Sequence, residues 1–257
     1  MKKIIFSFSV LFSVLVLFGC KKENADEVAD QSVAKTVDAS GKEKSVSLIP
    51  SVLFYDEGSL WFENAEGALE WYVTLNAGQT LYAYPASAES ESEVVEAQKL
   101  SKAGKKEQDV YIKVLYDQKD YWILSDLVVA NATAAVVIED TVNYSNDSID
   151  GLSSKAAKIP TGKIVAIHND YKGSDDSELS FVKVTWRNGK ERSYREVFLK
   201  SETVSTSSAD LTAVRIVNKI AGIKEPDSVV VNELVSNVMN LNLSAGIKDI
   251  FLSEMNY

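Results

Sequence analysis

Few side chains in this 257-residue sequence are suited to covalent or metal chemistry. The single cysteine is Cys20 and the single histidine is His168, so neither a zinc cluster nor a Cys-His catalytic pair can be assembled. No Gly-x-Ser-x-Gly motif of a serine hydrolase occurs. The stretch Asn146–Gly151 is faintly similar to a calcium loop, but Ala157 stands where the loop needs a glutamate. We therefore expect no metal, no cofactor and no enzymatic activity, although the abundant carboxylates leave an acid–base pair open.

The start of the sequence is typical of an export signal. Met1–Lys3 is basic, and the apolar stretch Ile4–Phe18 is shorter than the roughly 20 residues of a membrane-spanning helix. Leu17–Cys20 (LFGC) resembles a bacterial lipobox, in which the signal is cut before the cysteine and the thiol is lipidated. The resemblance implies a signal peptide at residues 1–19 and a lipid such as palmitate on Cys20. An uncleaved anchor is the alternative, and it attaches the chain to a membrane as well.

Composition predicts a tether and limits the partners. Residues 20–47 have almost no large apolar side chains, so we expect them to form a disordered tether. Without Lys2 and Lys3 of the signal, 25 basic side chains remain against 37 acidic ones. Such a surface repels nucleic acids, and it disfavours anionic glycans unless the charge is locally reversed. Peptides, or proteins with a basic patch, are the favoured ligands.

The middle of the chain repeats one β-rich pattern. The stretches 75–84 (LNAGQTLYAY) and 159–168 (IPTGKIVAIH) each place a glycine turn before a short strand, and they align Gly78 with Gly162. The flanking segments then match as follows: Val52–Phe54 with Val136–Ile138, Leu60–Phe62 with Val142–Tyr144, Tyr111–Tyr116 with Phe181–Trp186, Trp122 with Tyr194, and Leu127 with Leu199. Short alternating strands with turn residues between them favour two small barrels, at residues 48–130 and 133–201.

Both copies resemble bacterial SH3 (SH3b) domains. The second copy does so through Val142–Tyr144, the turn at 159–162, Phe181–Val184, the hairpin pair Asn188-Gly189 and Tyr194–Leu199. The first copy does so through residues 60–62, 75–78, 111–114 and 121–122, but it has no Asn-Gly pair and carries a long insert at 85–109. The resemblance implies a mainly β protein with two tandem SH3-like barrels. We expect the insert to be a disordered or part-helical surface loop, and a mobile lid is the alternative.

The periodicity of the sequence changes after a Ser/Thr-rich linker. Leu211, Val214, Val217 and Ile220 recur at helical spacing, with Ser208 or Asp210 as a possible cap and Gly222 as a possible end. Pro226 suits the first turn of a second helix with an apolar stripe of Val230, Leu234, Val238 and Leu241, and residues 247–255 suggest a third helix. We therefore expect a helical C-terminal segment at 208–257, which packs on a barrel or forms an oligomerisation face.

The SH3b resemblance implies recognition of cell-wall peptides or extended protein segments in aromatic-lined grooves. The candidate ligand-binding residues are Trp61, Trp71 and Tyr72 in the first copy, and Tyr144, Tyr171 and Tyr194 in the second. Core packing is the alternative for each aromatic residue, and we expect it for Phe62, Tyr144 and Trp186.

The predicted function is that of a non-enzymatic binding or scaffolding lipoprotein. We expect a lipid to hold it to a membrane of the bacterial cell envelope, on the periplasmic or surface side. The alternative is a structural subunit of an envelope complex, in which the helices form the partner surface. SH3-like modules also target hydrolases, but those enzymes carry a catalytic domain that this sequence does not supply.

Overall fold

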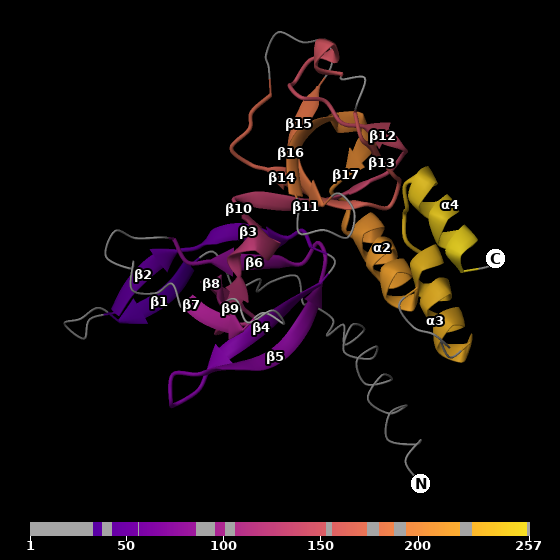
Figure 1. Ribbon diagram of the computed structural model, residues 1–257. Helices are drawn as coiled ribbons and strands as arrows, with labels where there is room; N and C mark the ends of the chain where they lie inside the picture. The colour runs from indigo at the N-terminus through magenta and orange to yellow at the C-terminus, as the bar shows by residue number, and fades with distance from the viewer. Residues whose placement is uncertain are drawn as a thin grey trace. The chain divides into compact units, whose positions relative to one another are not determined.

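The computed structural model describes residues 33–37, 43–55, 57–85, 96–100, 106–152, 156–173, 180–187, 194–221 and 228–255 (Figure 1). The predicted signal peptide and Cys20 lie outside the described residues. Residues Ser32–Tyr257 form one compact unit. The described part is mainly β, with several sheets and three α-helices. In this part of the chain, no helix is long and apolar enough to cross a membrane.

The first sheet contains eight of the described strands. Its order is β10 (Val128–Ala130), β3 (Ile49–Leu53), β6 (Thr80–Ala83), β8 (Lys106–Tyr116), β9 (Lys119–Leu124), β4 (Glu57–Glu63) and β5 (Leu69–Asn76), with β7 (Glu96–Leu100) pairing with β8. Its buried core includes Leu53, Leu60, Leu81, Val114 and Ile123. Strands β8 and β9 are joined by Asp117 and Gln118, which both have positive φ, the geometry of a two-residue type I′ hairpin.

The second sheet has five strands in the order β16 (Tyr194–Lys200), β15 (Phe181–Arg187), β14 (Ile164–His168), β11 (Ala132–Val137) and β17 (Val204–Ser205). A short ladder of β12 (Thr141–Val142) and β13 (Lys158–Ile159) lies apart from it, and Tyr144 bridges both Leu152 and Phe198. Val182, Val184 and Trp186 alternate along β15; Val184 and Trp186 belong to the core of this sheet and Val182 packs against it. The predicted Asn188-Gly189 hairpin lies outside the described residues.

The two sheets repeat one pairing scheme. The order β10-β3-β6-β8-β9 of the first sheet recurs as β17-β11-β14-β15-β16 in the second. The pair Val52–Thr80 recurs as Val136–Ile164, and the pair Ala83–Val114 recurs as Ile167–Val184. The predicted alignment of these segments is therefore confirmed.

The predicted alignment is wrong at the closing strand. Trp122 pairs with Lys113, and Lys183, the counterpart of Lys113 in the second sheet, pairs with Phe198 rather than Tyr194. Leu127 ends a 3-10 turn (Ser125–Leu127) whose counterpart, Ser201–Thr203, likewise follows the closing strand, so its match is Thr203 and not Leu199. The error is four residues, and it arises because the connection between β15 and β16 is longer than the tight turn between β8 and β9.

The structure also corrects two predictions about irregular segments. Within the predicted disordered tether (20–47), β1 (Val33–Val37) and β2 (Glu43–Ser47) form an antiparallel hairpin, because each strand satisfies the backbone groups of the other. Within the insert, β7 is extended rather than helical, because Glu96–Leu100 pairs with the first part of β8. Residues 86–95 and 101–105 of the insert lie outside the described residues.

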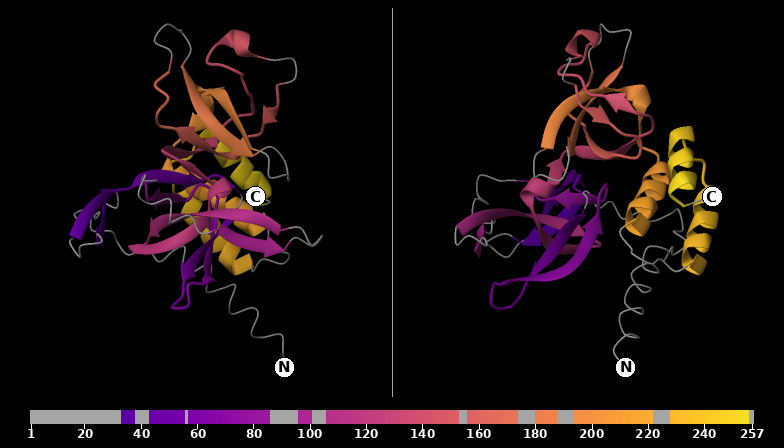
Figure 2. Two further views of the ribbon diagram at one scale, coloured as in Figure 1. Left: turned by 60° about the vertical axis from the view of Figure 1, so that its left-hand side comes forward. Right: turned by 45° about the vertical axis from the view of Figure 1, so that its right-hand side comes forward.

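The predicted helical segment is confirmed as α2 (Ser208–Ala221), α3 (Ser228–Met239) and α4 (Ala245–Glu254). Helix α2 packs against both α3 and α4, as the right-hand view of Figure 2 shows. Leu211, Val214 and Val217 are buried as the spacing predicts. Leu241 lies beyond the end of α3 and is 39% exposed, so its place on the predicted stripe is wrong. Gly222 and Pro226 lie outside the described residues.

The helices pack against each other and contact both sheets. Buried Asp210 accepts hydrogen bonds from the Ser205 hydroxyl at 2.7 Å and from the Ser244 amide at 2.8 Å, which joins the start of α2 to the start of α4. In α4, Gly246 lies so close to the carbonyl oxygen of Ile138 that a Cβ atom would overlap it. The C-terminal segment is therefore part of the folded protein.

This close approach makes the effect of Gly246→Ala a test of the docked helix. In a free helix, alanine is more favourable than glycine by about 1 kcal/mol. In the docked helix, we expect a loss of unfolding free energy of about 1–3 kcal/mol, because the new methyl group displaces the backbone of Ile138. Urea denaturation measures the change. Ala245→Gly, at the exposed neighbouring position, is the control and should cost no more than its helix propensity; a stabilising Gly246→Ala would contradict the docking.

Candidate functional site

Three tryptophans lie in one row across neighbouring strands of the first sheet. Trp61 on β4 is directly opposite Trp71 on β5 and Trp122 on β9. Opposed residues of antiparallel strands place their side chains on the same face of the sheet. Trp122 is buried, Trp61 is half-buried and Trp71 is 58% exposed. The row thus runs from the interior of the sheet to its edge and ends on an open indole ring.

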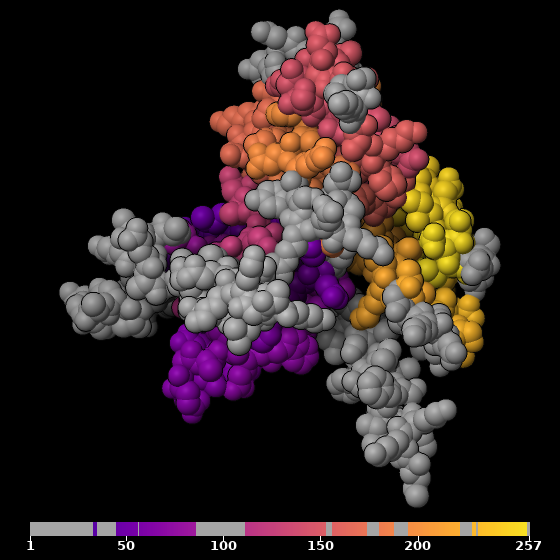
Figure 3. Space-filling view, in the orientation of Figure 1, coloured from indigo at the N-terminus to yellow at the C-terminus, as the bar shows by residue number. Residues whose placement is uncertain are grey.

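The exposed end of the row belongs to an edge strand. Among the described strands, β5 pairs only with β4, and its central residues Glu70, Trp71 and Tyr72 are exposed. The register shifts between Leu60 and Trp61, which marks a β-bulge of the kind that twists an edge. Figure 3 shows the violet atoms of β4 and β5 uncovered at the lower edge of this face. The backbone groups on the free side of β5 are therefore open to a partner strand.

Tyr72 lies next to Trp71 on β5 and packs against other tyrosines. Tyr72 is 46% exposed, and its ring stacks on Tyr121 at a centroid separation of 4.7 Å. Tyr121 in turn meets Tyr116 edge-on at 6.4 Å and belongs to the core of the first sheet. Successive residues of a strand point to opposite faces, so β5 presents an aromatic ring on each face. The stacking fixes the Tyr72 ring without covering it.

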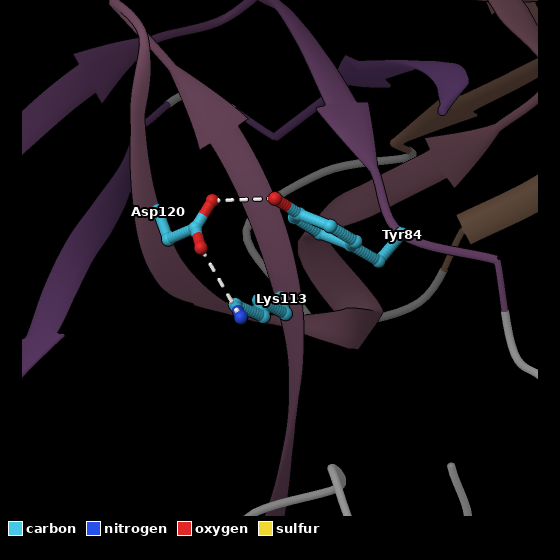
Figure 4. Close-up of polar contacts among 3 residues, drawn as sticks. All are labelled: Tyr84, Lys113 and Asp120. Carbon is cyan, nitrogen blue, oxygen red and sulfur yellow. Dashed lines mark hydrogen bonds and ion pairs between the residues drawn. The ribbon is translucent and has the colours of Figure 1, made fainter. Parts of the chain in front are cut away.

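A polar cluster continues the tryptophan row at its buried end. Lys113 on β8 is directly opposite Trp122. The Asp120 carboxylate accepts a hydrogen bond from the Tyr84 hydroxyl at 2.6 Å and pairs with the Lys113 ammonium at 3.1 Å (Figure 4). The Lys113 ammonium also lies 4.9 Å from the centre of the Tyr84 ring. The contacts fix the cationic group of Lys113 beside the aromatic row.

The structure brings the first-copy candidates together but not those of the second copy. Trp61, Trp71 and Tyr72 share the β4–β5 hairpin. Tyr144 is buried and meets Phe181 edge-on at 5.2 Å, so its expected core packing is confirmed, as it is for buried Trp186. Phe62, expected in the core, is instead 36% exposed.

The other two second-copy candidates do not add to a shared surface. Tyr171 donates a hydrogen bond to Asp147 at 2.8 Å and packs edge-on against Phe198 at 5.3 Å. Burial, together with the Asp147 carboxylate, raises the pKa of Tyr171 to about 12. Tyr194 begins β16 opposite Arg187, and its side chain lies outside the description. Tyr171 therefore anchors a loop through its hydroxyl group and is not an open ring.

The sequence interpretation missed four residues of this surface, namely Tyr84, Lys113, Asp120 and Trp122. A signal for two of them was present in Asp117–Asp120, a polar stretch between two strand-like segments. A two-residue turn pairs Tyr116 with Lys119, and counting back along both strands places Lys113 opposite Trp122. The contact of Tyr84 with Asp120 joins residues 36 apart in the sequence and has no such local signal.

The described residues offer little for acid–base or metal chemistry. The His168 ring nitrogen Nε2 is hydrogen-bonded to the Thr185 hydroxyl at 2.8 Å. Burial lowers the pKa of His168, and the nearby Lys183 ammonium lowers it further. Within the described part of the chain, no three His, Cys, Asp or Glu side chains are grouped so that they could hold a metal ion. The strongest arrangement is therefore the aromatic surface of β4, β5 and β9, which is suited to binding.

No family model and no curated protein sequence matches this chain. Among solved structures, the chain is similar to NlpC1 from Trichomonas vaginalis, with 11% sequence identity and a TM-score of 0.23. The match covers 77% of this chain and 66% of that one. A likeness at this level carries no conclusion about fold or function.

The environment of Tyr171 predicts a loss of stability at alkaline pH. Its pKa is raised from 10.0 to about 12 in the folded protein, so the stabilisation is complete below pH 10 and is lost as the pH rises to about 12. We expect Tyr171→Phe to remove this part of the pH dependence of the unfolding free energy. Asp147→Asn is the matched variant, and it should lower the pKa of Tyr171 partway, because burial still raises it. A difference titration of tyrosinate absorbance that places Tyr171 at its ordinary pKa would contradict the assignment.

Proposed function

We propose that the protein is a lipid-anchored, non-enzymatic binding protein of the bacterial envelope, and that its two sheets are SH3-like modules. On this proposal, the first module recognises an extended peptide carrying positive charge, from the cell wall or from an envelope protein. The lipobox at Leu17–Cys20 supports the anchor. The recurrence of one five-strand order and one register in both sheets supports a duplicated small β module.

The observation that carries the binding proposal is the exposure of Trp71 and Tyr72 on edge strand β5. An extended segment can add to the free edge of a sheet, where backbone hydrogen bonds give affinity and side chains give specificity. Trp71 is 58% exposed and Tyr72 is 46% exposed, so each presents a large apolar ring to a strand docked there. Aromatic anchors of this kind account for much of the binding energy at protein interfaces.

The charge of the hairpin favours a basic ligand. Residues 57–76 contain Glu57, Glu63, Glu66 and Glu70, and no lysine or arginine. A ligand ammonium or guanidinium group can lie over the face of Trp71, because the ring is attractive to cations, while the glutamates supply the opposite charge. The same glutamates repel a second copy of this acidic hairpin. The surface therefore favours a basic segment over self-association.

The helical segment is less suited to the alternative role of a partner surface. Leu211, Val214 and Val217 on α2 are already buried within the protein. Asp210 and Gly246 connect the helices to each other and to the second sheet. A deletion of residues 210–257 would therefore disturb the fold as well as any partner surface.

We expect Trp71→Ala to weaken binding to purified peptidoglycan, or to a basic extended peptide from an envelope protein, by at least about tenfold. Its side chain is mostly exposed, so the melting temperature should barely change. Ile149→Ala is the matched control, because Ile149 is 59% exposed in the other half of the protein. Co-sedimentation with peptidoglycan and calorimetry with the peptide separate the two sources. Equal binding by the wild type and Trp71→Ala, with folding intact, would refute the proposed surface.

The anchor is tested separately through Cys20. We expect Cys20→Ser to abolish labelling with a palmitate analogue and to move the protein out of the lipid-anchored membrane fraction, because no other cysteine is present. Detergent phase partitioning of the exported protein measures the shift. Unchanged labelling and partitioning of Cys20→Ser would show that the attachment does not use this thiol.

A further inference from the structure

A cavity of about 730 Å³ lies between the two sheets and α2. The first sheet contributes Phe54, Tyr55 and Ala77, the second contributes Ile164 and Arg187, and α2 contributes Arg215 and Lys219. Cavities that bind small molecules in proteins have volumes of roughly 300–1,000 Å³. This cavity has the size of such a site, and it is separate from the β5 surface.

The charge of the cavity wall is opposite to that of the whole protein. Its lining contains Lys163, Arg187, Arg215 and Lys219 but only one carboxylate, Glu57. The chain as a whole has a formal net charge of −10. Charge of one sign in a concave site concentrates ions of the opposite sign. The described lining therefore contains more basic than acidic side chains, unlike the chain as a whole.

Arg215 supplies a half-buried positive charge, and its hydrogen-bond acceptors among the described residues are backbone carbonyls. Its Nε donates to the carbonyl oxygen of Ala77 at 3.1 Å, and its Nη2 donates to the carbonyl oxygen of Gly78. Both acceptors are neutral, and a guanidinium group has five N–H donors. Burial lowers the pKa of Arg215, because removal from water disfavours the charged form of the guanidinium group. An anion in the cavity would supply an opposite charge and accept from the remaining donors.

Arg187 supplies a second guanidinium group in a fixed orientation. Its Cζ atom lies 3.8 Å from the centre of the Tyr55 ring, and the residue is 8% exposed. Stacking on an aromatic ring occupies the flat face of a guanidinium group and leaves its N–H groups directed along the plane. Tyr55 follows β3, whereas Arg187 ends β15, so this contact joins the two sheets at the cavity.

We infer that this cavity binds a small oxyanion with two or more carboxylate or phosphate groups, held by Arg215 and Arg187 with Lys163 and Lys219 nearby. Planar guanidinium groups bind both kinds of oxyanion through paired, charge-assisted hydrogen bonds. A ligand with two or more negative charges matches a lining of four basic groups and one acid. A long polyanion such as nucleic acid is unsuitable, because the acidic surface beyond the cavity repels it.

The test is calorimetric titration of the full chain in detergent with citrate and with pyrophosphate, at constant ionic strength, with acetate as the monovalent control. We expect saturable binding of at least one multivalent probe and none of acetate. Binding of citrate alone identifies a carboxylate ligand, binding of pyrophosphate alone identifies a phosphate ligand, and both outcomes support the inference. Failure of both probes to bind the folded protein would overturn it.

Variants locate the site. Arg215→Gln should abolish binding, and Lys219→Gln should weaken it by about tenfold, the effect of one charge-assisted hydrogen bond. Lys248→Gln, on the exposed face of α4, makes the same change of charge outside the lining and should bind as the wild type does. If Arg215→Gln does not fold, the affinities of Lys219→Gln and Lys163→Gln for the probe test the site instead. Equal affinity for all folded variants would refute the assignment, and it would leave the Trp71 surface unaffected.

Discussion

The pairing of the strands in both sheets depends on one turn, which is closed by a glycine with left-handed backbone geometry. Gly78 and Gly162 have φ of 76° and 80°, and their amides donate to the carbonyl oxygens of Leu53 and Val137 at 2.7 and 2.8 Å. Glycine adopts this conformation without steric cost, so the turn sets the register of β6 on β3, which pairs Val52 with Thr80, and that of β14 on β11, which pairs Val136 with Ile164. Arg215 uses the carbonyl of Gly78, so the same turn also fixes the C-terminal helices.

These observations separate two kinds of recognition within one acidic protein. On the β5 edge, Trp71 and Tyr72 present apolar rings among glutamates, which favours a basic extended chain. In the cavity, Arg187 and Arg215 are held by an aromatic ring and by backbone carbonyls, which favours a compact anion. The two proposed sites favour ligands of opposite charge, so the two ligands that we propose would not compete with each other.

The parts of the structure that local sequence patterns determine could be predicted, whereas the parts that depend on contacts between distant segments could not. The glycine turns and alternating strands are local patterns, so the matches of Val52 with Val136 and of Val114 with Val184 could be found by alignment. The match of Trp122 failed because loop length, which alignment around Gly78 does not fix, decides the register of the closing strand. The cavity could not be foreseen, because Tyr55, Arg187 and Arg215 come from segments far apart in the chain and meet only when the sheets and α2 pack together.

The position of Arg215 in the chain sets an order of assembly. Both sheets precede α2, so a nascent chain that has emerged only as far as β17 contains the strands of both modules but neither the guanidinium group nor the helix that lines the cavity. Maturation of that pocket must therefore wait for the C-terminal helices to dock, while the aromatic edge of β5 needs only the first module. The β5 edge, our proposed peptide-binding surface, is thus completed before the proposed anion pocket.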